Sequence, residues 1–194
     1  MTVVGILSLQ GAFARHREML STIGVYVQNV RYTDDLDKCQ GLIIPGGEST
    51  TISKLMDESG LRSAVLDFAR KKSILGTCAG MILLAQDTND EKVNPLGLID
   101  MKVSRNAYGR QVDSFITSLE LSLNGSSETT KGVFIRAPRV TSYGKEVEIL
   151  ASIEEEPVLV KQGLHIACSF HPELSGNSNI HHYFIKLIEG DSSS

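Results

Sequence analysis

The 194-residue chain lacks several features that would place it in other classes of protein. No apolar stretch approaches the roughly 20 residues that a membrane-spanning helix needs, so we expect no contact with a membrane. Lysine and arginine are not in excess, and the net charge of -4 argues against a nucleic-acid-binding surface. The first residues, Met1–Ile6, carry no basic segment and are typical of a first strand, not of a signal peptide.

Cysteine is also scarce, because the chain has only Cys39, Cys78 and Cys168. Three widely spaced cysteines are poor material for a disulfide framework, so we expect a cytoplasmic protein. No CxxC or HExxH spacing occurs, and we expect neither a metal site nor a cofactor. We interpret Cys168, which lies in an apolar segment, as a core residue, and Cys39 as a surface or packing residue.

The composition is that of an ordinary globular domain, with 41% hydrophobic and 22% charged residues. The length suits one well-buried domain and is short for two. No internal repeat or linker divides the chain. We therefore expect one domain over residues 1–190, followed by a flexible tail over residues 191–194.

The first half of the chain alternates between short apolar runs and segments with helical spacing. The expected strands are Val3–Leu9, Val25–Val30, Gly41–Ile44 and Ser73–Thr77, and the expected helices are Ala12–Ile23, Thr50–Met56, Leu61–Lys71 and a segment from the end of the fourth strand to about Gln86. This alternation predicts a parallel sheet with helices on both faces.

The second half is rich in strand-like segments. These are Met101–Val103, Ser114–Leu121, Gly132–Ile135, Glu146–Ile153, Pro157–Lys161 and Leu164–Phe170. The polar stretch Asn124–Thr130 is typical of a hairpin or loop, and a last helix is expected over Ile180–Ile188. We expect antiparallel pairs at the edge of the sheet, giving an α/β fold whose central sheet is mostly parallel.

The segment Gly76–Gly80 joins an apolar strand to an apolar helix and carries Cys78 at its centre. Glycine two positions before and after a nucleophile is typical of a strained strand-to-helix turn, where a side chain would clash with the backbone. A sulfur at a helix N-terminus is favoured as the thiolate. The alternative, a buried structural thiol, is disfavoured by the flanking glycines.

A base for this thiol is available in Phe170-His171-Pro172-Glu173. An imidazole that takes a thiol proton needs a third group to orient it, and Glu173 lies two residues beyond His171. His-x-Glu alone is a weak signal, and His171 alone would read as a hydrogen-bonded turn residue. Together with the glycine-flanked cysteine, it predicts a catalytic triad of Cys78, His171 and Glu173.

The segment Pro45–Thr51 contains the glycine pair Gly46-Gly47. Paired glycines let backbone N–H groups approach a bound oxygen, as the oxyanion of an acyl-transfer reaction requires. We predict an oxyanion hole from Gly46, Gly47 and the N–H of Ala79, with Glu48 presenting a carboxylate to a cationic substrate group. A plain turn and a phosphate cradle are the alternatives, although no Walker-type lysine follows.

Six segments resemble the family of glutaminase subunits of pyridoxal 5'-phosphate synthases, which are class I, triad-type glutamine amidotransferases. The segments are Ser8–Gly11, Pro45–Thr51, Gly76–Gly80, Arg105–Gln111, Phe134–Pro138 and Phe170–Leu174. They span nearly the whole chain, and Gly-Gly-Glu-Ser-Thr-Thr and Arg-Asn-Ala-Tyr-Gly-Arg-Gln are the most specific. The resemblance implies a flavodoxin-like three-layer sandwich.

The resemblance also implies hydrolysis of L-glutamine to glutamate and ammonia through a glutamyl thioester on Cys78. It assigns glutamine binding to Gly46, Gly47, Glu48, Arg105, Ile135 and Arg136. An arginine guanidinium suits the substrate carboxylate. The implied partner is the synthase subunit, which would receive the ammonia in a hetero-oligomer, and Gln10, Gly11 and His16 then form a candidate contact and activation surface.

Two other functions remain open at this stage. One is a non-catalytic regulatory module that binds the synthase subunit, which the intact Cys78, His171 and Glu173 disfavour. The other is a related cysteine hydrolase, such as a peptidase, on the same fold. Glu48 and Arg105 disfavour it, because they suit a free amino acid. Outside the family match, His16 reads as a solvated helix residue and His181-His182 as a helix face.

Overall fold

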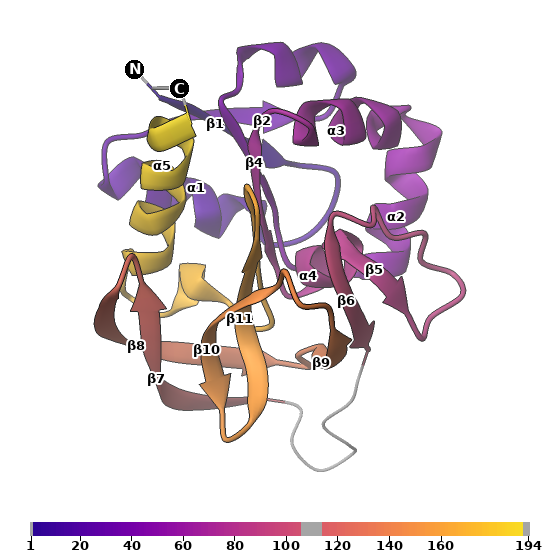
Figure 1. Ribbon diagram of the computed structural model, residues 1–194. Coiled ribbons are helices and arrows are strands. Elements are labelled where there is room, and N and C mark those ends of the chain that lie inside the picture. Colours follow the sequence, from indigo (N-terminus) through magenta and orange to yellow (C-terminus); the bar gives the residue numbers. More distant parts are fainter. Residues whose placement is uncertain (1, 106–113, 192–194) are drawn as a thin grey trace.

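The computed structural model describes residues 2–105 and 114–191, and a seven-stranded sheet crosses its centre (Figure 1). The strands of this sheet are β1 (Val3–Leu7), β2 (Tyr26–Val30), β3 (Gly41–Ile44), β4 (Ser73–Thr77), β10 (Glu148–Ile153), β11 (Glu156–Gln162) and β12 (His165–Cys168). They lie in the order β10-β11-β12-β4-β3-β1-β2. The five strands from β12 to β2 are parallel, and β11 and β10 extend the sheet antiparallel. The mostly parallel central sheet is thereby confirmed.

Helices cover both faces of this sheet. They are α1 (Phe13–Thr22), α2 (Ser49–Glu58), α3 (Leu61–Ala69), α4 (Ala79–Leu84) and α5 (Asn179–Asp191), with short 3-10 helices η1 (Thr33–Lys38) and η2 (Pro172–Leu174). Figure 1 shows α1 and α5 on one side of the sheet and α2 and α3 on the other. The expected three-layer sandwich is therefore confirmed.

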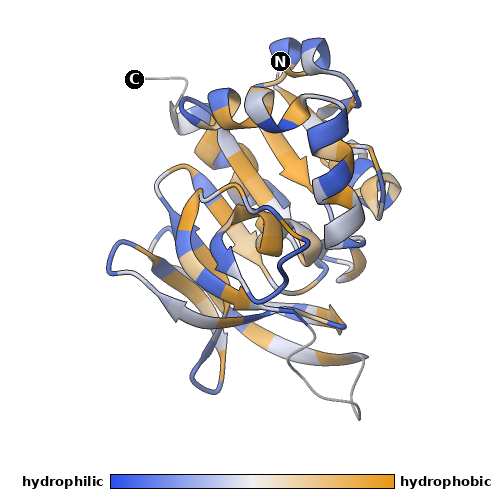
Figure 2. Cartoon of the chain, turned by 90° about the vertical axis from the view of Figure 1, so that its right-hand side faces the viewer, coloured by the Kyte–Doolittle hydropathy of each residue, from blue (hydrophilic) through white to orange (hydrophobic). Residues whose placement is uncertain are grey.

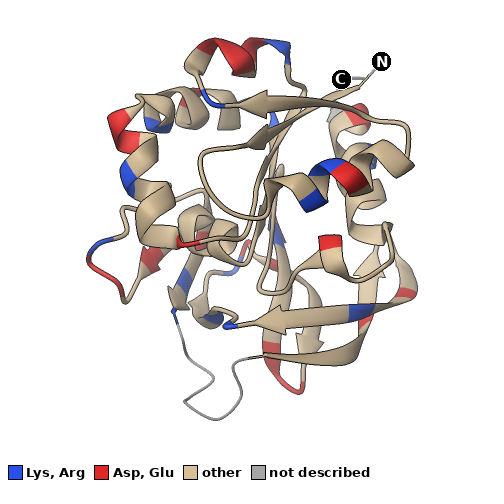
Figure 3. Ribbon diagram, turned by 180° about the vertical axis from the view of Figure 1, so that it is seen from behind, with Lys and Arg blue, Asp and Glu red and all other residues tan. Residues whose placement is uncertain are grey.

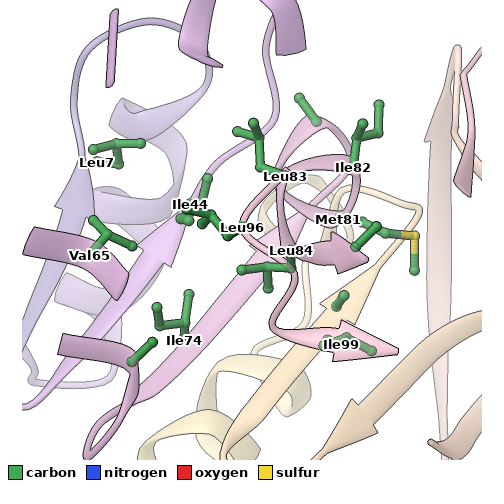
Figure 4. Close-up of a cluster of buried hydrophobic side chains, with 14 of the residues drawn as sticks. Leu7, Ile44, Val65, Ile74, Met81, Ile82, Leu83, Leu84, Leu96 and Ile99 are labelled. Carbon is green, nitrogen blue, oxygen red and sulfur yellow. The ribbon is translucent and has the colours of Figure 1, made fainter. Parts of the chain in front are cut away.

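Each face of the sheet has its own hydrophobic core. Successive side chains of a strand point to opposite faces, so Leu42 and Ile44 join the core under α2, α3 and α4, and Ile43 joins the core under α1 and α5. Figure 4 shows part of the first core, where Val65 of α3 and Leu83 of α4 lie near Ile44. Figure 2 shows the matching concentration of hydrophobic residues on the central strands.

The remaining strands form two further sheets, which the sequence analysis did not anticipate. One contains β5 (Ala85–Thr88), β6 (Ile99–Ser104) and β9 (Arg139–Tyr143), and the other contains β7 (Ser114–Leu123) and β8 (Ser126–Ile135). The expected antiparallel strands at the edge of the main sheet are β10 and β11, and β12 joins the same sheet parallel to β4, whereas β5 to β9 lie in the two further sheets. The helix expected to reach Gln86 ends at Leu84, because pairing of β5 with β6 outweighs the helix propensity of Ala85 and Gln86.

The polar stretch Asn124–Thr130 is a hairpin turn followed directly by strand. Asn124 and Gly125 have φ angles of 51° and 76°, the backbone of a two-residue turn that suits the twist of antiparallel strands. The rest of the stretch belongs to β8 and pairs with β7. The expected hairpin is therefore confirmed, with its turn confined to two residues.

The surface and the chain end complete the description. Figure 3 shows acidic and basic residues interspersed over the molecule. Within residues 2–105 and 114–191, no helix has the length and apolar character needed to cross a bilayer.

Asp191 is the last residue of α5, so the expected tail cannot begin there, and residues 192–194 lie outside the described part of the chain.

Helix α4 packs directly on the backbone of β3, at Gly80. A Cβ built on Gly80 would lie 2.0 Å from the carbonyl oxygen of Ile44, a distance that no folded protein tolerates. We expect Gly80→Ala to lower the free energy of unfolding by about 3 kcal/mol, since the backbone of α4 must move away from the sheet.

The measurement is urea denaturation followed by circular dichroism, with Gly190→Ala as the matched control. Nothing lies within 4 Å of a Cβ at Gly190 in α5. The control should therefore stay within about 0.5 kcal/mol of the parent chain. Equal stability of the two variants would contradict the close packing of α4 on β3.

Candidate active site

Cys78 stands at a strained turn between β4 and α4. Its φ and ψ angles are 51° and -105°, and a positive φ at a residue other than glycine costs about 1–3 kcal/mol. The N–H of Cys78 donates to the carbonyl oxygen of Cys168 at 2.8 Å, and the Cys78 carbonyl accepts from the N–H of Met81 at 3.0 Å. These bonds tie the turn to β12 and to α4, and the turn is the elbow that the flanking glycines indicated.

His171 reaches Cys78 because β12 pairs in parallel with β4. Cys168 is the register partner of Thr77, so the chain leaves β12 beside the point where β4 ends. The N–H of His171 donates to the carbonyl oxygen of Val133 at 2.8 Å, which anchors the loop, and its side chain lies beside Cys78 in the same cleft and interacts with it electrostatically.

Glu173, the third residue of the predicted triad, lies in the first turn of η2. The Nδ1–H of His171 donates to Oε1 of Glu173 at 2.7 Å, and the carboxylate is almost fully buried. The imidazole thus lies between the thiol and the carboxylate and is hydrogen-bonded to the carboxylate, the order that the triad prediction requires.

The pKa values of the two buried members fit an ionised pair. Burial lowers the pKa of His171, but hydrogen bonds and charge interactions with Cys78 and Glu173 outweigh it and raise this pKa to about 10. Burial raises the pKa of Glu173, yet its interactions with His16 and His171 lower it overall. The structure thus favours a carboxylate at Glu173 and a protonated imidazole at His171.

A cleft of about 300 Å³ opens beside Cys78 and His171. It brings together all the residues that the sequence analysis assigned to the oxyanion hole and to substrate binding, namely Gly46, Gly47, Glu48, Ala79, Arg105, Ile135 and Arg136. Gln10 also lines the cleft, whereas Gly11 and His16 do not. In the specific segment Arg105–Gln111, residues 106–111 lie outside the described part of the chain.

The glycine pair is held by the segment that leads into α1. The carbonyl oxygen of Gly46 accepts from the N–H of Ala12 at 2.9 Å, and Oε1 of Gln10 accepts from the N–H of Glu48 at 2.8 Å. Gly11 has a φ of 103°, and a Cβ there would lie 2.0 Å from the carbonyl oxygen of Gly46. The expected contact surface at Gln10-Gly11 is therefore in direct contact with the expected oxyanion loop.

Glu48 has a structural role that the sequence analysis missed. Its carboxylate is the N-cap of α2 and accepts from the N–H and hydroxyl groups of Thr50 and Thr51. Burial raises the pKa of Glu48, but these hydrogen bonds lower it to about 2. The hydroxyl-rich sequence after Glu48, directly before a helical segment, is the signal that could have revealed the cap. Its contact with a substrate ammonium stays a prediction.

Arg105 is oriented at the rim of the cleft by two carboxylates. Its guanidinium donates to Oε1 of Glu48 at 2.6 Å and to Oδ2 of Asp90 at 2.7 Å. A guanidinium fixed in this way is a preorganised site for a carboxylate ligand. Asp90, which the sequence analysis did not single out, therefore helps to orient the Arg105 guanidinium.

His16 is not a solvated helix residue, and that interpretation is wrong. Its side chain is fully buried, and its Nε2 lies 3.3 Å from Oε2 of Glu173. His16 therefore cannot touch a partner through its side chain. His181 is also fully buried, and of this histidine pair on α5 only His182 is exposed. Cys168 is a core residue as predicted, and the packing alternative holds for Cys39.

Comparisons with known proteins agree with the resemblance seen in the sequence. A model of the SNO glutamine amidotransferase family matches residues 6–190. Pyridoxal 5'-phosphate synthase subunit PdxT of Oenococcus oeni is 46% identical over 190 residues, which cover 97% of this chain and 98% of that protein. The protein of the same name from Exiguobacterium sibiricum is 49% identical over 186 residues, covering 96% and 95% of the two chains.

Solved structures give the same result for the fold. The crystal structure of a glutamine amidotransferase superposes with a TM-score of 0.90 at 43% identity, and the match covers 96% of this chain and 98% of the other. A putative GMP synthase subunit from Thermoplasma acidophilum superposes with a TM-score of 0.67 at 18% identity, over 100% and 95% of the chains, and shares the fold alone. The resemblance stated from the sequence motifs is confirmed.

The raised pKa of His171 gives the stability a defined pH dependence. The unfolded imidazole loses its proton near pH 6.5 and the folded one near pH 10, so the folded state binds more protons in between. The free energy of unfolding should fall as pH rises from 6.5 to about 8.5, by at most about 1.4 kcal/mol per pH unit for one proton. His171→Gln should flatten this decline.

Denaturant unfolding at a series of pH values makes the measurement. The matched control is His165→Gln, because burial lowers the pKa of His165 and its contribution is constant above pH 6.5. The control should keep the slope of the parent chain. An identical slope in His171→Gln and the parent would contradict a raised pKa at His171.

Proposed function

This chain belongs to the SNO glutamine amidotransferase family, and from that premise we propose that it hydrolyses L-glutamine to L-glutamate and ammonia. The ammonia supplies the synthesis of pyridoxal 5'-phosphate, the process named in its relatives at 46% and 49% identity. The observation that carries the proposal is the placement of Cys78 beside His171 at the edge of the cleft, with His171 hydrogen-bonded to Glu173.

These three residues supply each step of a thioester mechanism. The Cys78 sulfur attacks the side-chain amide carbon of glutamine, and the carbonyl electron pair moves onto oxygen, where backbone N–H groups of the glycine loop and Ala79 stabilise it. The tetrahedral intermediate collapses, and His171 gives a proton to the departing ammonia. Water then attacks the thioester while His171 takes its proton, and glutamate leaves with the thiol restored.

Substrate recognition follows from the charges around the cleft. Arg105 presents donors to the α-carboxylate of glutamine, and Arg136, whose backbone has a φ of 43°, contributes a second cation to the same cleft. The carbonyl oxygen of Ile135 lies 3.9 Å from the Cys78 sulfur, so this backbone passes directly beside the reacting centre. The carboxylate of Glu48 faces the ammonium group in this assignment.

The partner is a synthase subunit, and we propose that it docks on Gln10, Gly11 and the start of α1 to form a hetero-oligomer. Support comes from the hydrogen bond between the Ala12 N–H and the Gly46 carbonyl, since a shift of α1 acts on the glycine loop directly. Docking would turn the peptide between Gly46 and Gly47, which glycine permits. Equal glutamine turnover by the free chain and the complex would rule out this activation.

Two further proposals concern the whole chain. We propose that residues 1–190 act as one glutaminase domain, consistent with the family match over residues 6–190. We also propose that the protein works in the cytoplasm, because its three cysteines are all unpaired thiols. Fractionation of the source cells would test the second proposal, and recovery of the protein outside the cytoplasm would contradict it.

Replacing the nucleophile tests the function directly. Cys78→Ala should lower ammonia release from glutamine by at least about 10⁴-fold, because no other group can form the thioester. The fold should persist, since alanine fits the space of cysteine. Ammonia release is measured with and without the synthase subunit, and unfolding by circular dichroism.

Cys39→Ala is the matched control, because Cys39 is buried outside the cleft and should not affect turnover. Full activity in Cys78→Ala would refute the assignment of the nucleophile. Absence of ammonia from the parent chain, both alone and with the synthase subunit, would favour a non-catalytic regulatory module.

A further inference from the structure

Two fully buried histidines lie behind the triad, outside the cleft. His16 comes from α1 and His181 from α5, and neither ring has any solvent exposure. Nε2 of His16 lies 3.3 Å from Oε2 of Glu173 and 3.1 Å from the hydroxyl oxygen of Thr77. Nδ1 of His16 lies 3.0 Å from Nε2 of His181. The two rings thus extend the series of Cys78, His171 and Glu173 into the core.

The protons on these rings follow from what Glu173 can accept. An ionised carboxylate only accepts hydrogen bonds, and Oε1 already accepts from His171. Oε2 has no hydrogen-bond partner among the described residues, and the Nε2 of His16, which shares a hydrogen bond with the Thr77 hydroxyl, lies 3.3 Å from it. A proton on Nε2 is favoured there, because a ring lone pair would repel the carboxylate. The Nδ1 of His16 is then an acceptor, which takes the Nε2–H of His181.

The environment of His181 agrees with this assignment of tautomers. Nδ1 of His181 is buried and has no hydrogen-bond partner among the described residues. In the tautomer just assigned, this atom carries a lone pair and no proton. A buried lone pair without a donor is the less costly way to leave one nitrogen unpaired. In this assignment the Nε2–H of His181 donates to Nδ1 of His16, and the Nε2–H of His16 lies toward Glu173.

Both rings are neutral, because burial lowers the pKa of His16 and lowers that of His181 to about 3. The neutral state of His16 affects how Glu173 interacts with His171. A neutral N–H orients the carboxylate without adding a positive charge that would compete with the His171 imidazolium for Glu173. A cation in the place of His16 would weaken the support that Glu173 gives to His171.

We propose that His16, held in one tautomer by His181, is a positioning residue that fixes Oε2 of Glu173 so that Oε1 stays aimed at His171. The proposal rests on the glutaminase function proposed above. It assigns no contact with substrate, because neither histidine lines the cleft. Loss of the His16 N–H should therefore lower kcat and leave the KM for glutamine unchanged.

The groups that face the two rings define how pH enters the test. His16 faces Glu173, His171, His181 and the Thr77 hydroxyl. His181 faces His16, Glu173 and His182, and Glu173 also faces Cys168. Within the described residues, Glu173 is the only one of these groups that carries a negative charge next to His16. If Glu173 is oriented less firmly, the pH at which Cys78 and His171 exchange protons with solvent should therefore change.

The experiment compares two replacements of His16 in the full chain. His16→Phe keeps the ring volume and removes the N–H, and we expect kcat to fall roughly tenfold, as for other orienting hydrogen bonds around reactive groups. His16→Gln places a neutral N–H near the position of Nε2 and should restore most of kcat. Adding His181→Phe to His16→Phe should cause no further loss, because His181 acts through His16.

A second readout does not depend on the substrate. The rate of Cys78 alkylation by iodoacetamide is measured against pH without glutamine. In His16→Phe the profile should move to higher pH by roughly half a unit or more, because a poorly oriented Glu173 supports the imidazolium less well. His165→Phe is the matched control, since His165 is also buried with an unpaired Nδ1, at the opposite end of β12. It should leave the profile unshifted.

The outcomes separate the two proposals. A shifted profile that His16→Gln restores supports the positioning role. A parent-like kcat and profile in His16→Phe overturns it, as does a loss of kcat that His16→Gln does not rescue and that leaves the profile unshifted. If His16→Phe does not fold, His181→Phe decides, and an unshifted profile there overturns the proposal. Failure of the parent chain to hydrolyse glutamine, both alone and with the synthase subunit, refutes the glutaminase function only, because alkylation of Cys78 still reports on the positioning of Glu173.

Discussion

The parallel pairing of β12 with β4 is the interaction on which the site depends. It joins segments about ninety residues apart, with Cys168 opposite Thr77 and the Cys78 N–H bonded to the Cys168 carbonyl. Because β4 ends at the thiol and β12 leads into His171, this one register brings nucleophile and base together. A slip by one residue would turn the side chains of the strand to the opposite face and separate them.

Helix α1 and the residue before it contact both the glycine loop at Gly46 and the buried carboxylate of Glu173. At its start, the Ala12 N–H holds the carbonyl of Gly46, and one turn later His16 faces the carboxylate of Glu173. The glycine loop proposed as the oxyanion hole and the proposed triad acid Glu173 therefore share one support, which also carries the surface proposed for the synthase subunit. A partner that moves α1 acts on both at once, and this coupling needs no contact between the partner and the cleft.

Much of this arrangement is readable from the sequence, and the rest depends on contacts between distant segments. The bounds of β3 and β4 agree with their apolar runs, and the glycines around Cys78 mark the turn because only glycine permits α4 to approach β3. The burial of His16 was missed, although it lies on the same face of α1 as Leu20. Histidine reads as polar in a sequence, and its partners lie far along the chain, Thr77 61 residues away in β4 and the others 157 residues or more away in η2 and α5. The three-stranded sheet was also missed, because β6 pairs with β9 across the intervening β7–β8 hairpin, and such pairing leaves no local pattern.

The central claim is that Cys78 is a nucleophile inside a cleft shaped for glutamine. Labelling with a glutamine-like alkylating analogue, followed by mass spectrometry of the digested chain, tests it most directly. The account predicts one label, on Cys78, that excess glutamine blocks, with the buried Cys39 and Cys168 unmodified. A label on Cys78 that glutamine cannot block, or labelling of the other two cysteines in its place, would contradict it.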